Sequence, residues 1–308
     1  MSEFRNLEKT IRRPRTALLL LLTACALRAA EPPAPDPLRD LARLRQDSNP
    51  ARLDALKEIL RERGIPFELQ PFESKESPLG RKAGTNVVMT FGSGAREITV
   101  GAHYDAFEWK DNGKISQGMV DNGAGTIVMV RVAEALKDRP LRHRIRVVLF
   151  DKEEIDLGGS KAYVAARKPG EIAAAVNVDI AGFGDTALYG MGKTEGDALL
   201  HEVLGVICGE RRLTCLEFPK SPPSDDRSFQ AAGIPAISIG FLPRLQAYQA
   251  WLFLNGGKDS GLQEGYLPPI LKINHTPEDT LDKVDPGTLD LATGLVLDLL
   301  LRLDSAME

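Results

Sequence analysis

Residues 145–154 of this 308-residue chain read IRVVLFDKEE, an apolar run that ends in acidic side chains. Apart from Arg146, the run is apolar and rich in β-branched residues, which is typical of a strand buried on both faces of a parallel sheet. Asp151, Glu153 and Glu154 follow directly where that strand ends. Because ligands of open α/β sheets bind at the carboxyl ends of the strands, this stretch predicts both the fold class and the place of the chemistry.

Helical and strand-like stretches alternate on both sides of this strand. Apolar residues recur at helical spacing or in short β-branched runs, with Pro or Gly at many boundaries. The predicted helices cover residues 50–63, 122–137, 158–167, 195–208 and 286–303, and the further strands cover 66–72, 86–91, 97–102, 174–180, 186–190, 216–218 and 236–241. Asn49 and Asp285 are the expected caps of the first and last helices. The alternation predicts a single α/β domain with a mostly parallel, mixed central β-sheet sandwiched by helices.

The composition is that of an ordinary globular protein. Hydrophobic residues make up 43% and charged residues 27%, which excludes wholesale disorder. The 39 Lys and Arg residues against 43 Asp and Glu give a formal net charge of -4, which argues against nucleic acid as the main partner. Three cysteines are too few for a disulfide scaffold, and no apolar run reaches the roughly 18 residues that a membrane-spanning helix needs.

The first 24 residues resemble a secretory signal peptide of the bacterial lipoprotein type. Basic residues precede the apolar run at 18–22, and Leu22-Thr23-Ala24-Cys25 is similar to a lipobox. The resemblance implies cleavage before Cys25 and acylation of this residue, which would hold the protein on the periplasmic or outer-membrane face of a bacterial cell envelope. An ordinary signal peptide and a buried apolar segment are the alternatives. The proline-rich residues 25–37 are expected to form an extended tether to a domain over 38–308.

The two remaining cysteines could be joined, because export permits disulfides. Cys208 lies at the end of a predicted helix, and Cys215 lies at the start of a predicted strand. A bridge from helix to strand is therefore feasible, and two buried thiols are the alternative.

Acidic and imidazole side chains collect at further strand ends and in one late loop. They are His103 and Asp105 in AHYD, Asp121 in VDNGAG, Asp179 in NVD, and His275 in NHTPEDT. Each alone has an ordinary explanation as a helix cap, a structural histidine or a solvated acid. Together they would converge on one rim of the sheet. Two histidines with three carboxylates suit a pair of zinc ions with a bridging carboxylate, whereas calcium or magnesium would favour oxygen ligands alone.

In this combination the sequence resembles the co-catalytic di-zinc aminopeptidases, a family that includes bacterial leucyl aminopeptidases, glutamate carboxypeptidase II and glutaminyl cyclases. The motifs HYD, VDNGAG, FDKEE, NVD and HTPEDT occur in the order of the family, over about residues 85–302. The resemblance implies a zinc-exopeptidase fold for the domain over 38–308 and two zinc ions per chain.

The resemblance also assigns the metal ligands. Asp121 matches the carboxylate that bridges the two zinc ions. His103 and Asp179 would complete one zinc site. Glu154 and His275 would complete the other.

The remaining roles follow from the same motifs. Glu153 matches the general base, and Asp105 matches the partner that orients the ring of His103. If the chain is extended there, Glu153 and its neighbour Glu154 must point in different directions, one to the attacking water and one to the metal. In the family the peptide bond after the bridging aspartate is cis, so the resemblance implies a cis bond between Asp121 and Asn122.

The function implied by the resemblance is that of an exported zinc-dependent aminopeptidase. It would hydrolyse the N-terminal bond of a peptide or small amide through a metal-activated water, with Glu153 as the general base. Two alternatives stay open. One is a cyclase that closes N-terminal glutamine with a single zinc ion, and the other is a binding domain that kept the fold without catalysis. The sequence leaves the oligomeric state open, and a monomer is compatible with it.

One motif departs from the family. The usual Ser-Asp-His is Ser224-Asp225-Asp226 here, and Arg227 follows it. Arg227 could contact a substrate carboxylate or an oxyanion, or it could pair with an aspartate and hold a loop. The aromatic residues of the segment 244–268 could line a specificity pocket, or they could belong to a core helix.

Overall fold

The structure is a computed structural model that describes residues 36–190, 194 and 196–307. The predicted signal peptide and most of the predicted tether lie outside these residues. At the boundary, Pro37 is not the end of the tether but the first residue of helix α1 (Pro37–Arg43). Asp36 caps this helix by accepting a hydrogen bond from the backbone N–H of Leu38. Proline is compatible with a first helical turn because the N–H that it lacks would have no partner there.

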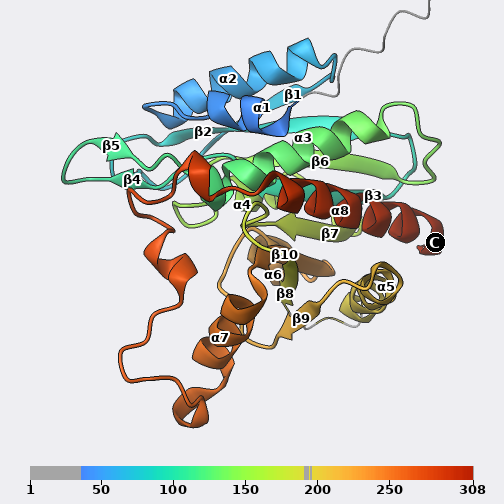
Figure 1. Cartoon of the computed structure of the whole chain (residues 1–308). Helices are drawn as coiled ribbons and strands as arrows, with labels where there is room; N and C mark the ends of the chain where they lie inside the picture. Colours follow the sequence, from blue (N-terminus) through green and yellow to red (C-terminus); the bar gives the residue numbers. More distant parts are fainter. Residues whose placement is uncertain (1–35, 191–193, 195, 308) are drawn as a thin grey trace, which may run out of the picture. The chain divides into compact units, whose positions relative to one another are not determined.

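A mixed sheet of eight strands forms the centre of the domain (Figure 1). In chain order the strands are β1 (Glu68–Glu73), β2 (Ala83–Phe91), β3 (Glu97–His103), β6 (Arg144–Phe150), β7 (Ile172–Val178), β8 (Thr186–Gly190), β9 (Cys215–Phe218) and β10 (Ala236–Leu242). Across the sheet their order is β1-β2-β6-β3-β7-β10-β8-β9. The four central strands β6, β3, β7 and β10 run parallel, β8 pairs in parallel with β9, and the other pairs are antiparallel. The mostly parallel, mixed sheet is as predicted. A separate two-stranded ribbon joins β4 (Glu108–Trp109) and β5 (Lys114–Ile115).

Helices cover both faces of this sheet. The further helices are α2 (Asn49–Glu62), α3 (Ala124–Leu136), α4 (Gly158–Ala165), α5 (Asp197–Arg211), α6 (Asp226–Ala231), α7 (Arg244–Asn255) and α8 (Pro286–Ala306). Figure 1 shows α3 and α8 side by side along one face, where α1 also packs against both. Neighbouring residues of β6 belong to two different cores, Val147 to the core under α3 and Val148 to the core under α4 and α6. Successive strand residues point to opposite faces, so the central strand is buried on both sides, as its sequence predicts.

Three helix starts differ from the prediction, and that of α5 is Asp197, two residues later than predicted. Ser48, not Asn49, caps α2, because its hydroxyl accepts a hydrogen bond from the backbone N–H of Ala51. The side chain of Asn49 instead bonds the backbone of Ala106 in both directions. Helix α3 begins two residues later than predicted, because the preceding segment Met119–Gly123 forms a π-turn with non-helical backbone.

Helix α5 also runs past its predicted end, to Arg211. A disulfide joins Cys208 in this helix to Cys215 at the start of β9, which settles the alternative that the sequence left open. The bond fixes the last turns of α5 to the edge of the sheet.

The two outermost strands of the sheet are β1 and β9. Pro71 lies within β1 and has no backbone N–H to offer. Strand β9 is only four residues long. The indole Nε1 of Trp251 on α7 donates a hydrogen bond of 2.9 Å to the carbonyl oxygen of Glu217 in β9.

Candidate metal centre

Three of the central parallel strands deliver acidic and imidazole side chains to one edge of the sheet. His103 is the last residue of β3, and Asp179 directly follows β7. Glu153 and Glu154 lie in the turn that follows β6. Because β6, β3 and β7 are adjacent and parallel, their carboxyl ends meet at the same edge.

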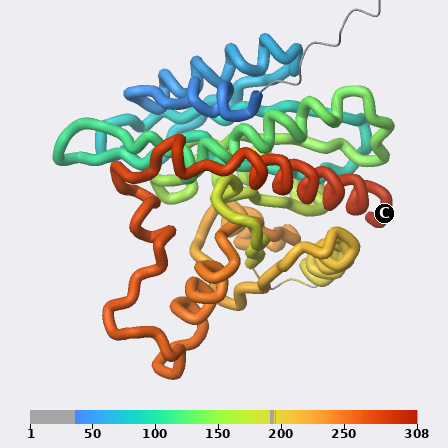
Figure 2. The backbone as a smooth tube through the Cα atoms, in the orientation of Figure 1, coloured from blue at the N-terminus to red at the C-terminus, as the bar shows by residue number. Residues whose placement is uncertain are grey.

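Two further side chains arrive on loops. Asp121 lies in the π-turn before α3. His275 lies in the long connection 256–285, which Figure 2 traces from α7 back to the start of α8. The ring of Phe107 stacks on that of His275 with centroids 4.4 Å apart, and Trp109 Nε1 donates to the carbonyl oxygen of His275 at 3.2 Å. These contacts fix the loop beside the sheet edge.

The five predicted ligands form two triads that share Asp121. His103 Nε2 lies 3.2 Å from Asp121 Oδ1 and 3.6 Å from Asp179 Oδ1. His275 Nε2 lies 3.4 Å from Asp121 Oδ2 and 2.9 Å from Glu154 Oε2. Within each triad the potential ligand atoms all lie within 4.8 Å of one another. The two oxygens of one carboxylate therefore face two different sites, which is the arrangement of a bridging ligand.

The unpaired atoms of this cluster fit bound zinc. His103 Nε2, Glu154 Oε1 and Asp179 Oδ1 are buried and make no hydrogen bond within the described part of the chain. Buried polar atoms are normally paired, so such a group indicates a ligand. One imidazole and two carboxylates per triad are nitrogen and oxygen donors of the kind that zinc accepts.

The charges of the cluster lead to the same conclusion. Burial and the neighbouring Asp121 raise the pKa of Glu154 to about 7. Hydrogen bonds to Asp121 and Glu154 raise the pKa of His275 to about 10. Burial opposes protonation of His103, but the surrounding carboxylates, Glu153 first among them, raise its pKa well above the ordinary value. The carboxylate of Glu154 is thus crowded by its neighbours, and a divalent cation would offset that crowding.

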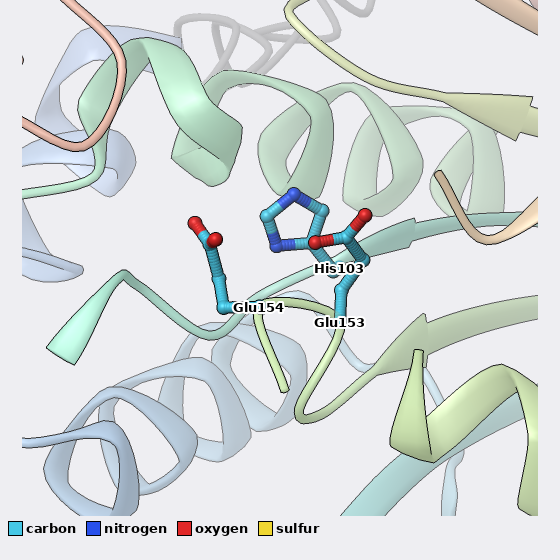
Figure 3. A group of neighbouring side chains, drawn as sticks. All are labelled: His103, Glu153 and Glu154. Carbon is cyan, nitrogen blue, oxygen red and sulfur yellow. The ribbon is translucent and has the colours of Figure 1, made fainter. Parts of the chain in front are cut away.

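Glu153 and Glu154 do not diverge as an extended chain would require. Residues 151–157 form a turn, and Lys152 has a positive φ of 60°. Figure 3 shows both side chains on the same side of the turn, flanking the ring of His103, and one oxygen of each carboxylate lies within 4.8 Å of a ring nitrogen and of the other oxygen. The turn brings the predicted base and the predicted ligand to the same site.

Asp105 links two parts of the centre. Its backbone carbonyl lies 3.1 Å from Nδ1 of His103, and its carboxylate lies 3.5 Å from the same nitrogen. The carboxylate also accepts hydrogen bonds from the backbone N–H groups of Glu153 at 3.1 Å and of Glu154 at 3.4 Å. Asp105 therefore positions the turn after β6 as well as the imidazole. The peptide bond between Asp121 and Asn122 is cis, as the resemblance implies.

Asp279 is a buried residue that the sequence reasoning missed. Its carboxylate accepts hydrogen bonds from three successive backbone N–H groups, those of Met119, Val120 and Asp121. These bonds hold the π-turn that presents the carboxylate of Asp121, which the two triads share. The only signal in the sequence is that Asp279 belongs to the same HTPEDT motif as His275.

Replacing Asp279 with Asn is expected to lower the free energy of unfolding by about 3 kcal/mol, because one of the two acceptor oxygens becomes a donor that faces a backbone N–H. Urea denaturation of the full chain measures the change. The matched control is Asp290→Asn, which removes an exposed ion pair with Arg131 and should cost less than about 1 kcal/mol. Equal losses in the two variants would contradict the role given to Asp279.

The motif that departs from the family supports the site from one side. Ser224 Oγ donates to Asp179 Oδ2 at 2.9 Å. Arg227 donates to the backbone and hydroxyl oxygens of Ser221 and to Gln230, which fits the alternative in which it holds a loop. Asp226 is buried and accepts a hydrogen bond from Gln230.

A cavity of about 450 Å³ opens beside the two triads. One wall carries Asp121, Glu153, Glu154, Asp179 and His275, and the other walls are mainly apolar. The apolar lining residues are Ile180, Leu188, Tyr189, Phe218, Pro222, Pro223, Phe241, Leu242, Ala250, Leu254, Pro268, Ile270 and Leu271. Helix α7 contributes Ala250 and Leu254 rather than its aromatic residues, so the aromatic part of the 244–268 segment does not line the cavity.

Comparisons with known proteins identify relatives of this chain. The model of the family described as peptidase family M28 matches residues 86–300. Aminopeptidase YwaD of Bacillus subtilis is 36% identical over 101 residues, which are 30% of this chain and 21% of that protein. The chain spans about half or less of the length of the curated relatives that it matches.

Solved structures share the fold. The Legionella pneumophila LapA aminopeptidase superposes with a TM-score of 0.65 at 18% identity, covering 89% of this chain and 72% of that one. The Bacteroides thetaiotaomicron glutaminyl cyclase bound to N-acetylhistamine superposes with a TM-score of 0.64 at 15% identity, covering 86% and 94% respectively. At these identities the likeness concerns the fold, and it confirms the predicted single α/β domain of the zinc-exopeptidase type.

Proposed function

The chain belongs to peptidase family M28, and on that premise we propose that it is a zinc-dependent aminopeptidase that removes N-terminal residues from peptides. One observation carries the proposal. The carboxylate of Asp121 lies between two imidazoles, His103 and His275, and each imidazole has a further carboxylate beside it. This arrangement supports two zinc ions per chain, one held by His103, Asp121 and Asp179 and one by Asp121, Glu154 and His275.

The residues around the ligands supply the proton transfers. Zinc ions held by the two triads would lower the pKa of a water molecule and polarise the scissile carbonyl. Glu153 accepts the proton of the attacking water and passes it to the nitrogen of the leaving amine. The carboxylate of Asp105 fixes the backbone of Glu153, which keeps the base at the edge of the sheet beside both triads.

The lining of the cavity favours the N-terminal end of a peptide substrate over its C-terminal end. Among the described lining residues no Lys or Arg is present to bind a substrate carboxylate. The apolar walls fit a large apolar side chain at the N-terminal position of the peptide.

Two alternative functions remain as secondary proposals. A cyclase acting on N-terminal glutamine is supported by the shared fold with the Bacteroides thetaiotaomicron enzyme. A binding domain without catalysis would keep the fold but has no need for the complete ligand set and Glu153. Product analysis separates the three.

We expect the zinc-loaded protein to shorten peptides stepwise from the N-terminus in a defined mixture followed by mass spectrometry. Peptides that begin with Leu or Phe should be cleaved at least about tenfold faster than those that begin with Glu or Lys, because the charged side chains would enter an apolar cavity. N-acetylated versions of the same peptides are the control and should stay intact. Removal of zinc with a chelator should abolish cleavage, and added zinc should restore it.

Other outcomes would contradict the proposal. Loss of ammonia from peptides that begin with Gln, without cleavage of any peptide, would make the protein a cyclase. Zinc binding without any change in the peptides would favour the binding domain.

We also propose that the protein is exported and held at a membrane by a lipid on Cys25. The lipobox-like sequence and the Cys208–Cys215 disulfide, a bond that persists in oxidising compartments, support this proposal. None of the helices that the structure describes is long and apolar enough to span a membrane. Intact-mass measurement of the protein isolated from membranes tests the proposal, since a mature chain that begins at acylated Cys25 is expected.

A further inference from the structure

A fully buried arginine lies behind the metal centre, outside the residues that the family model matches. Arg52 belongs to the first turns of α2, and its side chain has no exposed surface. The matched region begins at residue 86. An isolated arginine on a helix is usually solvated, so its complete burial requires an explanation.

The guanidinium of Arg52 joins segments that are far apart in the sequence. Its Nε donates to the carbonyl oxygen of Tyr104 at 2.7 Å. Its two terminal nitrogens donate to the carbonyl oxygens of Gln117 at 2.6 Å and Gly118 at 3.2 Å, and one of them also donates to Leu44 at 3.0 Å. A planar group with several fixed donors can hold such carbonyls at once.

Two of these segments carry metal ligands. Tyr104 lies between His103 and Asp105, so the bond to its carbonyl fixes the end of β3. Gly118 lies at the start of the π-turn that presents Asp121. From these contacts we infer that Arg52 is a positioning residue of the metal centre, which holds the loop after β3 and the loop before α3 at the separation that both triads require.

The charge of Arg52 fits this position. Burial lowers its pKa to about 10, while the nearby Asp105, Asp279 and Asp121 act in the opposite direction, so the side chain remains a cation at neutral pH. A buried cation beneath a group of buried carboxylates offsets part of their mutual repulsion.

The same helix offers a matched control. Arg63 at the C-terminal end of α2 is also buried, with 6% of its side chain exposed, and it is paired with Asp40 and Glu134. None of its described partners belongs to a loop that carries a metal ligand. Variants of Arg63 should therefore lower stability without moving the ligands.

The inference rests on the proposed zinc centre, and zinc affinity is its test. We compare Arg52→Lys and Arg52→Met with Arg63→Lys and Arg63→Met in the full chain, by competition with a chromogenic zinc chelator and by thermal unfolding. Lys keeps the buried charge, but its donors all radiate from one nitrogen and do not match the planar spread of the guanidinium, so Arg52→Lys is the variant expected to stay folded. We expect both Arg52 variants to bind zinc about 10- to 100-fold more weakly than the wild type, the range typical for partners that orient metal ligands. The zinc affinity of the Arg63 variants should stay within about threefold of the wild type, even where their Tm falls as much as that of the Arg52 variants.

The outcomes separate this inference from the proposed function. Wild-type zinc affinity in Arg52→Lys, or an equal loss of affinity in Arg63→Lys, would overturn the role of Arg52. A wild-type chain that binds zinc but cleaves no peptide would remove the proposed activity and leave the comparison of affinities valid. A wild-type chain that binds no zinc would overturn both.

Discussion

Replacing Glu153 with Gln is expected to lower kcat by between about 10²- and 10⁴-fold, the range that a positioned general base contributes. The amide has nearly the shape of the carboxylate but cannot accept the proton of the attacking water. The backbone N–H of residue 153 would still donate to Asp105, so the turn after β6 should keep its place. Zinc stoichiometry and KM are therefore expected to change little, and steady-state kinetics with zinc analysis measures both.

The control for this variant is Glu278→Gln. Glu278 lies three residues beyond His275 and is exposed, and its described hydrogen bonds are backbone contacts with Thr276 and Thr280. Its replacement should leave kcat within about twofold of the wild type. A Glu153→Gln enzyme with wild-type kcat would show that another group accepts the proton.

Replacing Asp121 with Asn is expected to affect both metals at once. An amide has a single oxygen that can ligate, and its nitrogen carries protons that face the second site. Loss of a metal ligand should weaken zinc binding more than loss of a residue that only orients a ligand. The affinity for at least one zinc ion should therefore fall by more than about 100-fold. Equilibrium dialysis with metal analysis should then give fewer than two zinc ions per chain, and peptide cleavage should fall in parallel.

Asp282→Asn is the matched control for the bridging residue. Asp282 is exposed, pairs with Thr280 and Lys283, and belongs to neither triad. Its replacement should leave zinc binding unchanged. Two tightly bound zinc ions in the Asp121→Asn protein would show that Asp121 does not bridge.

The sequence predicted the sheet and the convergence of the candidate ligands because both depend on local patterns. A strand buried on both faces requires an apolar run such as 145–150, and few other structures produce one. The side chains that follow such strands, His103, Glu154 and Asp179, then meet at one edge because the strands are parallel. Asp121 and His275 lie on loops, where residue type alone marked them as candidates, and the roles of all five residues came from the resemblance to a family.

The supporting residues could not be predicted in the same way. The roles of Arg52 and Asp279 depend on backbone groups of residues 104, 117–118 and 119–121, which are remote in sequence. Asp279 does not differ in its local pattern from a solvated residue. Arg52 shares the buried helix face of Leu56 and Ile59, but that spacing does not reveal which backbone groups it would bond. Asn49 was expected to cap a helix, and it bonds Ala106 because the loop after β3 lies within its reach. Tertiary contact, not local propensity, determined these outcomes.

The edges of the sheet bear on how the folded protein behaves at high concentration. An open sheet exposes unpaired backbone groups, on which a second molecule can add strands and begin to aggregate. Here Pro71 interrupts the donors of β1, and β9 is too short to guide a partner and has one carbonyl occupied by Trp251. Growth of the sheet from one molecule into the next is thereby disfavoured on both sides, so a crowded population of these domains can remain dispersed.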